Sequence, residues 1–122
     1  MLNFAFAVLA LAVLFGALLA VLHLREGAAP PPWPFGALHG TIGVGGLALL
    51  VLALRGPPRG VEQGVGSFGT IAAVLLALAV LLAIALIAAR LRGKRLAGTL
   101  IGAHATLAIS GFVVLMVYVL SS

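Results

Sequence analysis

Four long stretches without any charged residue limit what this chain can fold into more than any other feature. The seven basic and two acidic residues all lie within 25–26, 55–62 and 90–95. About 20 apolar residues are enough for a helix to cross the hydrocarbon core of a bilayer, and inside lipid a helix satisfies its own backbone hydrogen bonds. The sequence therefore predicts an all-α membrane protein, a single domain over 1–122 with four transmembrane helices at about 3–24, 36–54, 67–89 and 97–120.

The composition supports this class and excludes several functions. Apolar residues make up 64% of the chain and charged residues 7%, whereas soluble domains carry about a quarter charged residues. The high pI reflects cations at helix ends, so we expect the lipid bilayer and not a nucleic acid as partner. No cysteine is present for thiol or iron–sulfur chemistry. No Asp or Glu lies within a span, although ion-coupled transporters usually place a carboxylate there.

The distribution of basic residues predicts the orientation in the membrane. Five of them lie on one side, at Arg25, Arg90, Arg92, Lys94 and Arg95, and two on the other, at Arg55 and Arg59. Cytoplasmic loops carry the excess of Lys and Arg. We therefore expect the five-residue side in the cytoplasm and both termini in the periplasm of a bacterial inner membrane.

The chain also contains an internal repeat. Residues 39–47 and 104–112 share a histidine, a threonine and a glycine at equivalent positions, and 9–14 resembles 76–81. Two tandem helical hairpins explain this pattern, the first at about 1–60 and the second at about 66–122. Each hairpin has two spans, so both copies would have the same orientation and be related by a pseudo-twofold axis along the membrane normal.

Two histidines occupy equivalent places in this repeat, each followed by a strip of small residues. Helical residues four and seven positions further on share a face. They are Gly43 and Gly46 after His39, and Ala108 and Gly111 after His104. Smooth strips allow close helix packing, and they also suit a flat macrocycle held edge-on between helices. The two histidines are therefore candidate axial ligands for a haem iron.

This arrangement resembles the four-helix membrane-embedded b-type cytochromes. The resemblance implies one haem b between the second and fourth spans, with His39 and His104 as its metal ligands. The basic turn of Arg92, Lys94 and Arg95 would pair with the haem propionates, and His23 would bond a propionate or lie at the membrane interface. Many such proteins bind two haems with four histidines, whereas this chain has three histidines in all.

The resulting functional hypothesis is one-electron transfer to or from a quinone or a partner redox protein, and not a stand-alone enzyme. One haem near one face cannot carry electrons across the whole bilayer, so a redox partner, a second copy or a larger complex is expected. Two alternatives stay open. The chain is a non-catalytic accessory subunit of a respiratory or photosynthetic complex, or a pigment- or lipid-binding module in which one histidine is a single axial ligand.

Overall fold

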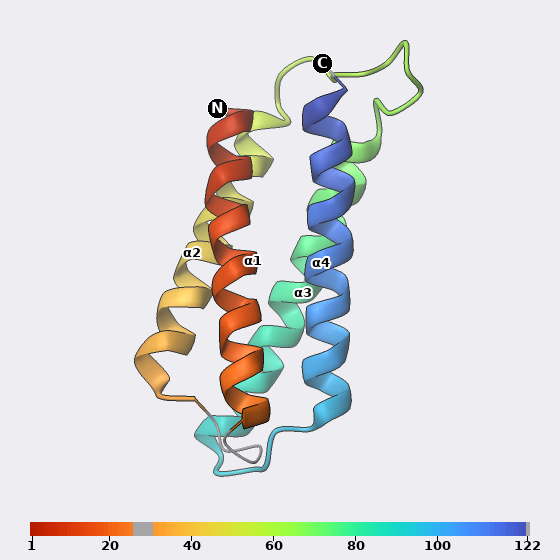
Figure 1. Cartoon of the computed structure of the whole chain (residues 1–122). Helices are drawn as coiled ribbons and strands as arrows, with labels where there is room; N and C mark the ends of the chain where they lie inside the picture. The colour runs from red at the N-terminus through yellow and green to blue at the C-terminus, as the bar shows by residue number, and fades with distance from the viewer. Residues whose placement is uncertain (26–30, 122) are drawn as a thin grey trace.

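The computed structural model describes residues 1–25 and 31–121, and this part of the chain is all-helical, without strands. Its four helices are α1 (Leu2–Arg25), α2 (Trp33–Ala53), α3 (Phe68–Leu91) and α4 (Gly98–Leu120) (Figure 1). All four are long and apolar enough to cross a membrane. The predicted all-helical fold with four helices of membrane-spanning length is confirmed, with helix bounds within three residues of those expected.

The chain around the helix ends explains these bounds. Pro34 lies in the first turn of α2, where the N–H that proline lacks would have no helical acceptor. α3 ends at Leu91, and Gly93, two residues beyond it, has a φ of +66°, which favours a residue without a Cβ. The Lys94 N–H donates a hydrogen bond of 2.9 Å to the Ala89 carbonyl, which closes the last turn as in a Schellman motif. The basic turn between α3 and α4 is therefore sharp.

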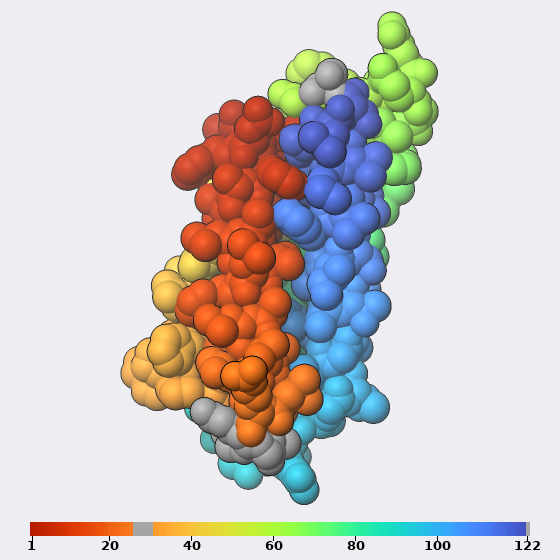
Figure 2. Space-filling model, viewed as in Figure 1, coloured from red at the N-terminus to blue at the C-terminus, as the bar shows by residue number. Residues whose placement is uncertain are grey.

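The helices form two antiparallel hairpins, α1 with α2 and α3 with α4. The hairpins meet along α1 with α4 and along α2 with α3, so α2 and α4 are diagonal to each other. The start of α1, the end of α4 and the 54–67 loop lie at one end of the bundle, which we call the terminal end (Figure 1). The α3–α4 turn lies at the other, which we call the turn end. α1 and α4 form most of the face seen in Figure 2, with part of α2 visible beside α1, and the 54–67 loop protrudes beyond this face.

The packed core occupies only the half of the bundle next to the terminal end. Phe6 of α1 and Phe112 of α4 stack there with ring centroids 5.1 Å apart, and this contact joins the two hairpins. No described residue in the half next to the turn end is buried. The buried residues are Leu2, Ala5, Leu9, Ala12, Gly46, Leu50, Gly69, Ala72, Leu76, Ala79, Gly111, Leu115 and Tyr118.

Large apolar side chains cover the outside of the helices. Leu14 is 70% exposed, Leu81 61% and Ile84 56%. In water such a surface would drive association, whereas lipid solvates it. The exposed surface is therefore consistent with an integral membrane protein.

Tyr118 corrects one expectation about the membrane interface. Its position near the end of the fourth span predicts an aromatic interfacial anchor, but the side chain is only 3% exposed. Its hydroxyl accepts a hydrogen bond of 3.1 Å from the Arg59 N–H. A buried phenol usually has a polar partner, and here the partner is the loop backbone. Tyr118 thereby connects the 54–67 loop to the core. Trp33 at the start of α2 is 71% exposed, and its place at a helix end also predicts an interfacial anchor.

Candidate functional site

The structure brings together the two histidines that the repeat singles out. His39 lies in the second turn of α2 and His104 in the second turn of α4, so both lie in the turn-end half of the bundle. Their ring centroids are 6.1 Å apart and their ring planes are perpendicular. Since α2 and α4 are diagonal helices, the two side chains meet across the interior of the bundle.

Each histidine is held by a backbone carbonyl of its hairpin partner. Nδ1 of His39 lies 2.9 Å from the Ala12 oxygen of α1. Nδ1 of His104 lies 2.8 Å from the Ala79 oxygen of α3. A carbonyl can only accept, so each Nδ1 carries the proton and donates it. In a neutral imidazole the Nε2 lone pair then stays available. A metal-ligating histidine is oriented in the same way by a hydrogen bond from its other ring nitrogen.

Gly16 of α1 lies directly against the His39 ring. A Cβ at Gly16 would be 2.8 Å from Cε1 of His39 and 3.4 Å from each ring nitrogen. Any side chain there would push the imidazole away from the Ala12 carbonyl. Sequence reasoning missed Gly16, Ala12 and Ala79. The alignment of 9–14 with 76–81 already placed the two alanines at equivalent positions, but apolar repeats carry no sign of a backbone hydrogen bond.

The small residues that follow the histidines divide into two groups. Gly46 and Gly111 are buried within their hairpins, where an added Cβ would lie 2.8 Å from Leu9 and 2.9 Å from Leu76. These two contacts are close helix packing, and a role for either glycine in lining a cofactor stays a prediction. Gly43 and Ala108 are half-buried and nearer the histidines. A Cβ at Gly43 would meet nothing within 4 Å.

The remaining candidate residues gather at the turn end. Arg92, Lys94 and Arg95 are exposed on the α3–α4 turn, and His23 is half-buried in the last turn of α1. Arg90 donates a hydrogen bond of 2.9 Å from Nη1 to the Pro31 carbonyl, which fixes the end of α3 to the segment before α2. The half of the bundle that contains the histidines therefore has a strongly cationic end at the α3–α4 turn. Its other end adjoins the apolar core.

The two repeated threonines do not contribute side chains to the site. The Thr41 hydroxyl donates to the Ala37 carbonyl and the Thr106 hydroxyl to the Gly102 carbonyl, both at 2.8 Å. These bonds to the preceding turn are the expected use of a threonine inside a helix. Within the described residues, no three His, Cys, Asp or Glu side chains are grouped to hold a metal ion. The site thus offers two imidazole ligands and needs a cofactor to supply any others.

Comparison with known proteins identifies no relative: no family model, no curated protein and no solved structure matches the chain. The class of protein is therefore defined by its fold and site, as a bundle of four helices long and apolar enough to span a membrane, with a histidine pair across its interior.

We expect Gly16→Ala to displace His39 and lower stability by about 1–3 kcal/mol, the usual cost of overpacking. The matched control is Gly40→Ala, because a Cβ there meets nothing within 4 Å. The denaturation midpoint in detergent gives the stability, and the ¹⁵N chemical shifts of His39 report whether Nδ1 keeps its proton and its acceptor. Unchanged midpoint and shifts in Gly16→Ala would show that α1 does not approach the ring this closely.

Proposed function

We propose that the protein is a membrane b-type cytochrome that binds one haem between His39 and His104. The observation that carries this proposal is the pair itself, two imidazoles on diagonal helices, each with Nδ1 committed to a carbonyl and Nε2 left for a metal. The competing interpretation is an aromatic contact between the rings, which prefers centroids 4.5–7 Å apart.

The spacing of the rings fits two axial ligands on one iron. A metal lies about 2.0 Å from an imidazole nitrogen, and that nitrogen lies roughly 1.1 Å from its ring centroid, given ring bonds of about 1.3–1.4 Å. Two imidazoles in line on one metal therefore have centroids roughly 6.2 Å apart, close to the 6.1 Å observed. Perpendicular ring planes are compatible with this, because rotation about the common axis leaves both nitrogens on the metal.

The surroundings of the pair also suit a flat macrocycle. The half of the bundle that contains the histidines has no buried side chain among its described residues, so the hairpins pack tightly only in the other half. Gly43 and Ala108 present little side-chain bulk next to the pair. Arg92, Lys94 and Arg95 lie at the adjoining end, where guanidinium and ammonium groups would pair with propionates. His23 is a second candidate partner for a propionate at this end.

A tandem repeat with a pseudo-twofold axis along the membrane normal accounts for the pairing. Equivalent residues make equivalent contacts in the two hairpins: His39 with Ala12 and His104 with Ala79, and Gly46 with Leu9 and Gly111 with Leu76. Two helical hairpins related in this way would place one histidine each on opposite sides of a shared central site.

The chemistry proposed for this site is one-electron transfer with a quinone or a partner redox protein. Haem supplies a redox centre whose potential is set by its axial ligands and its burial. His39 and His104 would both hold the iron, and two imidazole ligands favour electron transfer over oxygen binding. The Ala12 and Ala79 carbonyls would raise the basicity of the ligating nitrogens, and the apolar helices would keep water away. A second copy or a larger complex would extend the electron path across the bilayer.

The proposed location is a bacterial inner membrane, with the turn end in the cytoplasm and both termini in the periplasm. The excess of basic residues at the turn end supports this orientation. The haem would then lie nearer the cytoplasmic leaflet.

A visible absorption spectrum of the detergent-purified full chain tests the proposal. The protein would be expressed with excess haem precursor, oxidised in air and then reduced with dithionite. We expect sharp reduced α and β bands and a shifted Soret band, with about one haem per chain by pyridine haemochrome assay. A colourless, folded protein would overturn the cytochrome proposal and favour the accessory-subunit alternative, in which the histidine–carbonyl bonds only join the helices of each hairpin.

A further inference from the structure

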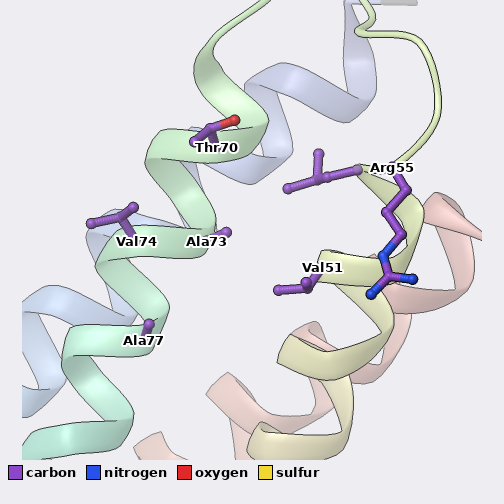
Figure 3. A pocket seen from close by; sticks show the side chains of 7 residues that line it. Val51, Arg55, Thr70, Ala73, Val74 and Ala77 are labelled. Carbon is purple, nitrogen blue, oxygen red and sulfur yellow. The ribbon is translucent and has the colours of Figure 1, made fainter.

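A groove between α2 and α3 lies near the terminal end, away from the histidine pair. Its volume is about 360 Å³, and apolar side chains of both helices line it, among them Val51, Ala73 and Ala77. Figure 3 shows Val51 of α2, and Arg55 just beyond the end of α2, across the groove from Thr70 and Ala73 of α3. The groove is mainly apolar. Arg55 and Thr70 lie at its terminal-end side, and the Arg55 side chain turns back along α2, so that its guanidinium lies beside Val51 (Figure 3).

The two polar groups at this end have no partner in the described part of the chain. The Arg55 guanidinium makes no hydrogen bond or ion pair there, and the Thr70 hydroxyl makes no hydrogen bond. Thr41 and Thr106 bond the carbonyl four residues earlier, but Thr70 lies in the first turn of α3 and has no helical carbonyl at that place. Both groups are exposed and face a ligand or solvent.

The position of these groups relative to the bilayer indicates which kind of ligand would fit. Arg55 lies two residues beyond the end of α2, and Thr70 lies in the first turn of α3, so the backbone of both lies where a bilayer changes from hydrocarbon to headgroups. From there the groove follows two membrane-spanning helices. A ligand that fits has a negative head next to an apolar chain.

We infer that this groove binds one anionic phospholipid. The phosphate would accept hydrogen bonds from the Arg55 guanidinium, whose donors match phosphate oxygens, and from the Thr70 hydroxyl. One acyl chain would lie along Val51, Ala73 and Ala77. This inference does not depend on the haem proposal, because the two sites share no residue.

Native mass spectrometry of the delipidated full chain tests the inference, with phosphatidylglycerol and phosphatidylcholine of equal chain length as probes. We expect the wild type to bind phosphatidylglycerol in preference to phosphatidylcholine with one lipid per chain. Arg55→Gln should weaken phosphatidylglycerol binding about fivefold, the effect of one basic residue near an anionic surface. Ala77→Leu, which adds bulk to the apolar part of the groove, should weaken both lipids.

Arg59→Gln is the matched control, because it removes the same charge from the same loop and its side chain does not line the groove. We expect its affinity for phosphatidylglycerol to stay within about twofold of the wild type, since it contributes only screened attraction. Equal effects of the Arg55 and Arg59 substitutions would overturn the proposed site, as would equal binding of the two lipids. Displacement of the lipid by inorganic phosphate alone would also overturn it, by showing an anion site without an acyl-chain site.

Discussion

Replacing either His39 or His104 with alanine is expected to abolish the low-spin haem spectrum of the purified protein. Each substitution removes one of two axial ligands, and a porphyrin in an apolar bundle has few other specific contacts to hold it. The loss of affinity should exceed the roughly 10–100-fold that removal of an outer-shell partner costs at a metal site. The measurement is the haem-to-protein ratio together with the reduced α band.

The matched control for these variants is His23→Ala, which removes the third histidine from the same end of the bundle. It should keep the α band and change the haem content only modestly. Helical content and elution from size exclusion separate ligand loss from unfolding. A full Soret band in both His39→Ala and His104→Ala would show that the pair does not ligate haem. Loss in only one of them would replace the pair with a single axial ligand, as the pigment-binding alternative requires.

Replacing Gly46 or Gly111 with alanine is expected to destabilise the bundle by about 1–3 kcal/mol each, the cost of forcing extra volume into a packed contact. A Cβ at either position would lie within 3.0 Å of a leucine side chain on the partner helix. Since both leucines are buried in the core, neither can move without disturbing its neighbours. Unfolding in detergent, followed by helical content or by steric trapping, gives the free energy.

Two neighbouring glycines provide matched controls. A Cβ at Gly45 or at Gly102 would meet nothing within 4 Å, and alanine favours a helix over glycine by about 1 kcal/mol. Gly45→Ala and Gly102→Ala should therefore be neutral or slightly stabilising, with effects opposite in sign to those at Gly46 and Gly111. Equal effects at Gly45 and Gly46 would mean that the hairpin does not pack along the face described here.

The histidine pair shows which features of the candidate site could be predicted from the sequence. The shared His-x-Thr pattern at 39–41 and 104–106 was enough to select the two histidines and to place them at similar depth. It could not show that the rings meet at 6.1 Å, because that distance depends on how the two hairpins pack. Nor could it show the hydrogen bonds to Ala12 and Ala79, because any residue in a helix offers the same backbone carbonyl.

Gly46 and Tyr118 show that the sequence also could not predict which residues pack against each other. A strip of small residues predicts that something approaches the helix closely, but the identity of the neighbour depends on the rotation of the helix. For Gly46 the neighbour in the structure is Leu9 of α1. For Tyr118, the position near a span end suggested the membrane interface, and the burial of the ring depends on the angle at which α4 meets α3.

The sequence by itself determined that this chain forms four apolar helices of membrane-spanning length, because the spacing of charges along the chain decides which segments lipid can accept. It also selected the residues with the chemistry to bind a metal. Only the tertiary structure decided that α2 and α4 are diagonal and that their histidines meet across the interior. It also decided that the packed core fills only the half of the bundle next to the terminal end. These features depend on helix rotation and crossing, which are set by contacts between residues far apart in the chain.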